Sequence, residues 1–122
     1  MNELVDRLRR AYRRELDLYV EVERLGEAGL GVARDGRPLA ELNQINSEKQ
    51  RFLRKIAEIE ASISSDKHAW RKASPPDLIG DELDGLLQEL RVRIERILEL
   101  ERESERWILE NSGALDTKAA HS

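Results

Sequence analysis

Reactive side chains are scarce in this sequence. It has no cysteine, which excludes disulfide bridges, thiolate nucleophiles and metal sites built on cysteine. Its two histidines, His68 and His121, lie in no catalytic or metal-binding motif. The glycines at Gly26, Gly29 and Gly31 lack the preceding strand and the following lysine and hydroxyl of a phosphate-binding loop. We therefore expect no enzyme activity, no metal and no cofactor.

The chain also lacks a long apolar run and an excess of positive charge. Residues 1–14 are charged from the third residue and contain no apolar stretch of the kind found in a secretory signal, so we expect a cytoplasmic protein without membrane insertion. The net charge of -4 gives no general attraction for nucleic acid. One basic patch is present, and it consists of Arg9, Arg10, Arg13 and Arg14. Asp6 and Asp17 partly neutralise this patch, so we expect no nucleic-acid partner.

The abundant residues favour helices. Ala, Glu, Lys, Leu and Arg make up 67 of the 122 residues, a bias typical of long helices and coiled coils. Apolar residues at alternating spacings of three and four begin at Leu4 and predict a first helix over residues 3–25, with Glu15 at one seam position. Four glycines lie between Gly26 and Gly36, where we expect a frayed helix end and a turn.

The same spacing predicts two further helices. The second covers residues 39–73, includes Lys49 at a seam position, and is stopped by a pair of prolines. The third covers residues 78–110 and ends close to Gly113, a residue suited to a helix C-cap. Residues 114–122 carry little that could pack, so we expect a flexible tail there.

These patterns predict an all-α fold with one helical domain over residues 1–113. We expect an elongated antiparallel bundle, or coiled-coil-like hairpin, of three long helices, because short links place consecutive helices side by side. Segment 39–73 has a net charge of +2 and segment 78–112 of -5, so we expect the second and third helices to pack together. Three such helices leave apolar stripes partly uncovered, which favours a partner's helix or a second copy.

Several large or charged residues occupy unusual positions. A charge at the seam position of Lys49 costs stability unless its stem reaches solvent or an acid meets it, so a register-setting or partner-facing role is open. We interpret Trp70 as core packing, whereas for Trp107 an interface role and plain packing stay equally open. Glu101 and Glu105 share a helix face but lack a histidine three residues away, so we interpret them as a solvated acidic stripe.

Three stretches resemble the FlgN family of flagellar type III export chaperones. Residues 39–53, which read LAELNQINSEKQRFL, are similar to the start of that family's second helix. Residues 18–25, which read LYVEVERL, resemble the end of its first helix, and residues 86–100 resemble its third. The chain departs from the family at Glu101 and Ser104, where asparagines three apart are common, and in its longer glycine-rich break.

The resemblance implies a cytoplasmic chaperone that binds C-terminal amphipathic helices of the flagellar hook-filament junction proteins. Such a chaperone prevents their premature assembly and delivers them to the export apparatus. In the family the C-terminal part carries most client contacts, so the candidate partner-binding residues come from the third predicted helix. They are Leu87, Leu90, Ile94, Ile97, Trp107 and Ile108. The alternative is a structural coiled-coil adaptor that acts through self-association, and the sequence leaves open whether the chain forms a homodimer.

Overall fold

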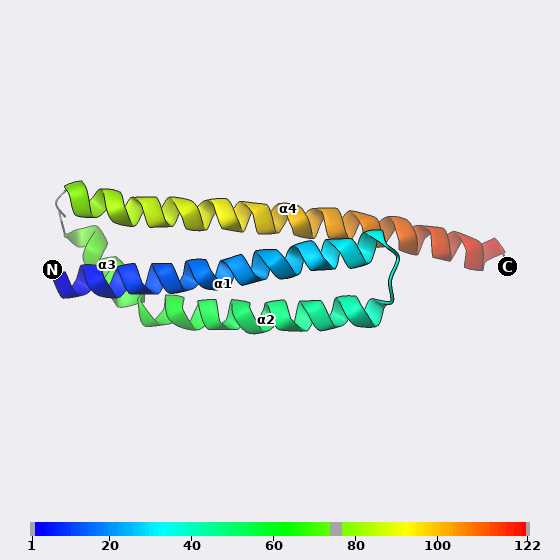
Figure 1. Ribbon diagram of the computed structural model, residues 1–122, viewed down its shortest axis with the longest axis horizontal. Coiled ribbons are helices and arrows are strands. Elements are labelled where there is room, and N and C mark those ends of the chain that lie inside the picture. The colour runs from blue at the N-terminus through cyan, green and yellow to red at the C-terminus, as the bar shows by residue number, and fades with distance from the viewer. Residues whose placement is uncertain (1, 74–76, 122) are drawn as a thin grey trace.

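The computed structural model describes the backbone of residues 2–73 and 77–121, and the side chains of residues 3–73 and 81–110. The described part of the chain folds into helices joined by short links, so the predicted all-α class is confirmed. The expected proline stop at residues 74–76 lies outside the described residues. Within these described residues, four helices follow one another in chain order (Figure 1). They are α1 (Asn2–Arg34), α2 (Leu39–Ser62), α3 (Ser64–Lys72) and α4 (Asp77–His121).

The first helix is longer than the sequence predicted. We expected α1 to end at Leu25, but it continues through the glycines to its end at Arg34. A methyl group placed on Gly26 would lie 3.4 Å from Leu100 of α4, and one placed on Gly29 would lie 3.5 Å from Leu42 of α2. These distances are ordinary van der Waals contacts, so α4 and α2 lie close to α1 at the two glycines. Tertiary packing of both neighbouring helices on α1 outweighs the roughly 1 kcal/mol that each glycine costs a helix interior.

The second predicted helix is divided in two. The continuous helix expected over residues 39–73 breaks at Ile63, where φ is -105° and ψ is 6°. Just before the break, the hydroxyl of Ser62 donates a hydrogen bond to the carbonyl of Ile59 over 2.7 Å. Serine hydroxyls that bond to the backbone in this way compete with the helix ladder and bend it. The turn before α2 is tight, with Gly36 at a φ of 63°.

The last helix also exceeds its predicted bounds. We expected a helix over residues 78–110 with a cap near Gly113, whereas α4 continues to His121 across the segment assigned to the tail. A single glycine lowers helix stability by only about 1 kcal/mol. The alanines, leucine and lysine that follow it are strong helix formers. Their combined preference accounts for the continuation.

The helices are arranged around α1, which lies between α2 and α4 (Figure 1). α1 and α2 run in opposite directions, while α1 and α4 run in the same direction. Among the described residues the backbones of α2 and α4 do not come into contact, and these two helices meet only through side chains, so they pack less closely than we expected. The apolar seam of α1 has two sides, and α4 packs on the side that α2 leaves free. Burial of apolar surface therefore decided the pairing, and the weak attraction between exposed charges did not.

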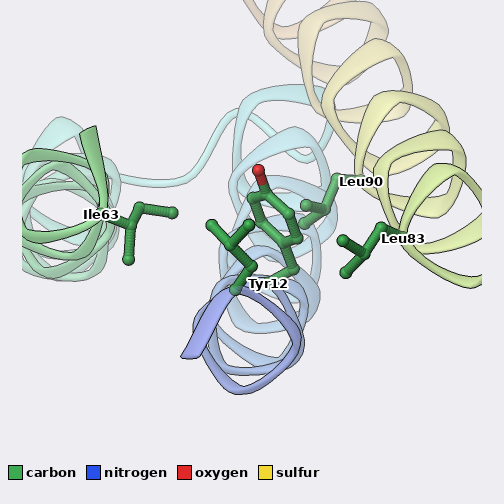
Figure 2. Packing of buried hydrophobic residues seen from close by; sticks show 5 residues of the cluster. Tyr12, Ile63, Leu83 and Leu90 are labelled. Carbon is green, nitrogen blue, oxygen red and sulfur yellow. The ribbon is translucent and has the colours of Figure 1, made fainter. Parts of the chain in front are cut away.

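Two clusters of buried side chains hold the helices together. Figure 2 shows the first cluster, in which Tyr12 of α1 lies between Ile63 on one side and Leu83 and Leu90 of α4 on the other. The second joins α1, α2 and α4 through Val22, Ile56 and Ile97. Ion pairs along the outer edge of α1 and α4 add to this packing. They are Arg9 with Glu82, Glu23 with Arg93, and Arg34 with Glu103.

Candidate helix-binding groove

The backbones of α2 and α4 stay apart along α1, and a pocket opens between α4 and α2 or α3 toward each end of the bundle. One wall of this space is α4 and the other is α2 continued by α3, while side chains from both walls cover the α1 seam beneath it, where Leu8, Glu15 and Val22 are at most 1% exposed. In the end-on view of Figure 2, the hydroxyl of Tyr12 points into the space between the two walls. We call this space the central groove.

The α4 wall of the central groove is apolar and open. Leu87, Ile94 and Leu98 have exposed fractions of 37%, 37% and 44%. Positions 87, 94, 98 and 101 are spaced by seven, four and three residues, so these side chains lie on one face of the helix. This face points toward α2 and α3, because Leu87 lines a pocket with residues of α3 and Glu101 forms an ion pair with Lys49 of α2. We call Leu87, Ile94 and Leu98 the apolar stripe.

A pocket lies at the α3 end of the central groove. It has a volume of about 380 Å³ and lies between α1, α3 and the start of the apolar stripe. Its lining combines the half-buried indole of Trp70 with the cations of Lys67 and Arg71. Trp70 packs against the first core cluster, as its sequence interpretation expected.

The opposite end of the central groove is polar. Lys49, which is only 12% exposed, reaches from α2 to Glu101 of α4 over 3.8 Å. This side-chain contact spans the groove where the backbones of α2 and α4 stay apart. Next to it lies a second pocket, of about 330 Å³, whose floor is made by Gly26 and Gly29. The lysine at the predicted seam position is therefore met by an acid from the other wall.

A buried polar group lies on α1 beneath the central groove. Glu15, only 1% exposed, is packed near Glu60 of α2, which itself forms an ion pair with Lys67 of α3. Burial and the neighbouring carboxylate of Glu60 raise the pKa of Glu15 to about 8. Burial also raises the pKa of Tyr12 to about 12. Lys67 forms its ion pair with Glu60, and among the described residues the Oε1 atom of Glu15 has no hydrogen-bond partner.

The structure divides the predicted partner-binding residues into three groups. Leu90 and Ile97 are buried in the two core clusters, so they cannot contact a partner while α4 packs on α1, and their assignment is corrected to the core. Leu87 and Ile94 belong to the apolar stripe. Periodicity did not separate the two pairs, because adjacent seam positions look alike until it is known which of them faces α1.

The third group of predicted partner-binding residues, Ile108 and Trp107, lies near the polar end of the central groove. Ile108 is half-buried and lines the glycine-floored pocket. Trp107 is 37% exposed, but it lies about 140° around α4 from Ile94 and so points away from the central groove. Leu98 was not among the predicted partner-binding residues. It widens the apolar face of the third predicted helix, and this width was the signal that could have identified it.

The basic patch of α1 is divided among several contacts. Arg9 and Arg13 pair with Glu82 of α4, at 2.7 Å and 3.8 Å. Arg10 and Arg14 line a shallow pocket that Ile59 and Ser62 of α2 also line. The four arginines are therefore divided between ion pairs with α4 and a pocket beside α2.

The described part of the chain offers neither a membrane-spanning helix nor a metal-binding cluster. None of its helices combines the length and apolarity needed to span a membrane. Among residues 3–73 and 81–110, no three acidic or histidine side chains gather closely enough to hold a metal ion. No family model, curated protein or solved structure matches this chain.

Proposed function

We propose that the protein is a helix-binding export chaperone that holds a partner's amphipathic helix in the central groove. Helix-in-groove recognition needs apolar anchors along one face of an open groove. The apolar stripe supplies three anchors over about 16 Å of α4, which corresponds to roughly three turns of a bound helix. The observation that carries the proposal is that these residues remain exposed while facing the other wall.

Burial of the apolar stripe supplies the driving force. Complete burial of a leucine or isoleucine side chain contributes about 1.5–3 kcal/mol, and the stripe residues are already partly covered. Each would contribute on the order of 1 kcal/mol to binding. A bound helix would rest on α2 and α4 together and turn the three long helices into a four-helix bundle, an arrangement with a closed core.

The family resemblance indicates which class of partner the central groove would bind. The similarity of residues 39–53 and 86–100 to FlgN chaperones supports the C-terminal helices of flagellar hook-filament junction proteins as clients, with delivery to the export apparatus in the cytoplasm. The stretch 39–53 includes Lys49, Phe52 and Leu53, which lie along α2. The resemblance and the groove are thus independent supports for one proposal.

Peptide titration tests the proposal. A synthetic C-terminal helix of a junction protein should bind the chain at one to one in calorimetry, and Ile94→Lys should weaken binding by about tenfold or more, because a lysine cannot be buried unpaired against the client. The matched control is Val92→Lys. Val92 is also exposed, at 54%, but lies on the opposite side of α4. Equal affinity of the two variants would contradict the groove, and absence of binding to the wild type would contradict the chaperone.

Self-association is a second candidate function. Val92, Trp107 and Leu109 are exposed on faces of α4 outside the central groove, and they could bring two copies together in a structural adaptor. Sedimentation of the pure protein separates the candidates. A stable dimer that does not dissociate when the peptide is added would favour the adaptor.

A further inference from the structure

The glycine-floored pocket at the polar end of the central groove has no role in the apolar contacts described above. We propose that this pocket receives an arginine side chain of the bound helix and thereby fixes the helix's register along the groove. The inference rests on the proposed function and adds a chemical requirement to the partner.

The shape of the pocket suits a long side chain. Gly26 and Gly29 have no side chains to fill the space between α2 and α4, and the pocket has a volume of about 330 Å³. Leu42, Leu100 and Ile108 line it with apolar surface. The methylene groups of an arginine would lie against these residues, as such stems commonly do on apolar surface.

The polar lining of the pocket accepts hydrogen bonds. Glu101 and Glu105 of α4 bring two carboxylates, while Lys49 brings one cation. The Lys49 to Glu101 distance of 3.8 Å is longer than a charge-assisted hydrogen bond of about 2.7–2.9 Å, so Glu101 keeps its acceptor capacity. Among the described residues, Glu105 takes part in no ion pair. One added cation would balance the charges of the pocket.

Neutral groups complete the acceptor set. The side chains of Asn46, Gln50 and Ser104 line the same pocket, and no hydrogen bond engages them within the described part of the chain. Arginine presents five donors in a planar fork and binds carboxylates with two parallel bonds. A lysine would satisfy the charge but fewer of the acceptors. Arginine is therefore the side chain that this lining fits best.

The position of the pocket sets where the arginine must lie. Glu101 and Glu105 follow Leu98, the last residue of the apolar stripe, by three and seven residues on the same face of α4. A bound helix should therefore carry its arginine about one to two turns beyond its last apolar anchor. The pocket accepts an arginine from a bound helix of either direction, so the arginine can precede or follow the anchors in sequence.

Designed peptides test the inference. The probes share one amphipathic sequence, with leucines spaced by seven and four residues, and differ only in carrying arginine or glutamine four residues before or after the leucines. We expect one arginine peptide to bind the wild-type protein about fivefold to tenfold more tightly than its glutamine counterpart, with the difference reduced at high salt. The Glu105→Gln variant should bind the two peptides of that pair almost equally.

Controls keep this result separate from the test of the groove. Glu95→Gln removes a carboxylate from the exposed surface of α4 outside the described pockets, and it should preserve the preference for arginine. Equal binding of arginine and glutamine peptides to the wild type would overturn this inference and leave the groove intact. Failure of every peptide to bind would overturn the proposed function, and the inference with it.

Discussion

At the residue scale, Glu15 is the side chain least suited to its surroundings. A buried carboxyl group without its own cation favours the protonated form, because the low local polarity penalises charge and Glu60 already occupies Lys67. Glu15 thus lowers the stability of the chain at neutral pH. It also places a polar group in the core beneath the central groove, and polar groups in a helical core can restrict the ways in which helices pair.

The stability of the protein should fall as the pH rises from about 4.5 to 8. The pKa of Glu15 in the folded state is raised to about 8, whereas an unfolded glutamate titrates near 4.3, so the folded chain holds this proton more tightly. The stabilisation that this proton provides is complete below the pKa of Glu15 in the unfolded state. It is lost as the pH rises through the pKa of Glu15 in the folded state. Urea denaturation at a series of pH values measures this slope.

Replacement of Glu15 identifies the source of the slope. Glu15→Gln should flatten the pH dependence between pH 5 and 8 and raise the free energy of unfolding at pH 8 by on the order of 2 kcal/mol. Glu58→Gln, which changes an exposed carboxylate on α2, is the matched control and should leave the slope unchanged. The lowered pKa of Glu60, stabilised in its charged form by Glu15 and Lys67, acts below this pH range. An unchanged slope in Glu15→Gln would contradict the assignment.

At the scale of the elements, sequence reasoning succeeded where packing and pattern agree. The unbroken alternation after Leu39 predicted a helix that the structure contains, and only the bend at Ile63 was missed. The predicted end of the first helix at residue 25 was wrong because it followed from the low helix propensity of the glycines, without the helices that pack against them. Gly26 and Gly29 are places where two other helices approach, and no local pattern announces that approach.

Substitutions of two nearby glycines should have opposite effects on stability. Gly31 lies inside α1 with open space around its Cα, so Gly31→Ala should stabilise the protein by about 0.5–1 kcal/mol. Gly36 has a φ of 63°, a conformation that costs alanine about 1 kcal/mol, so Gly36→Ala should destabilise it. Thermal denaturation of both variants measures the contrast. Destabilisation by Gly31→Ala would mean that α1 ends before this residue.

The candidate site could be predicted only in part for a related reason. Hydrophobic periodicity placed the binding surface on the third predicted helix, but it grouped Leu90 with Ile94 although one is buried and the other is 37% exposed. The difference depends on which face of α4 is turned toward α1. That face is set by packing between residues distant in sequence, such as Leu8 and Leu83, which belong to the same core cluster.

At the scale of the whole molecule, the central groove couples binding to folding. A helix that binds only the folded chain stabilises it by mass action, by about 2.7 kcal/mol at a free concentration one hundred times the dissociation constant. We therefore expect a junction-protein helix peptide to raise the denaturation midpoint of the wild type. The same peptide at the same concentration should raise the midpoint of Ile94→Lys far less. A midpoint that does not move at saturation would contradict binding to the folded state.

The shared direction of α1 and α4 gives the molecule an electrical polarity from end to end. Each helix carries a partial positive charge at its N-terminus and a partial negative charge at its C-terminus, and α2 alone cancels only one of the two aligned helices. A fourth helix running in the same direction as α2 would leave two helices pointing each way. The balance of these opposed dipoles favours that direction of entry over the reverse.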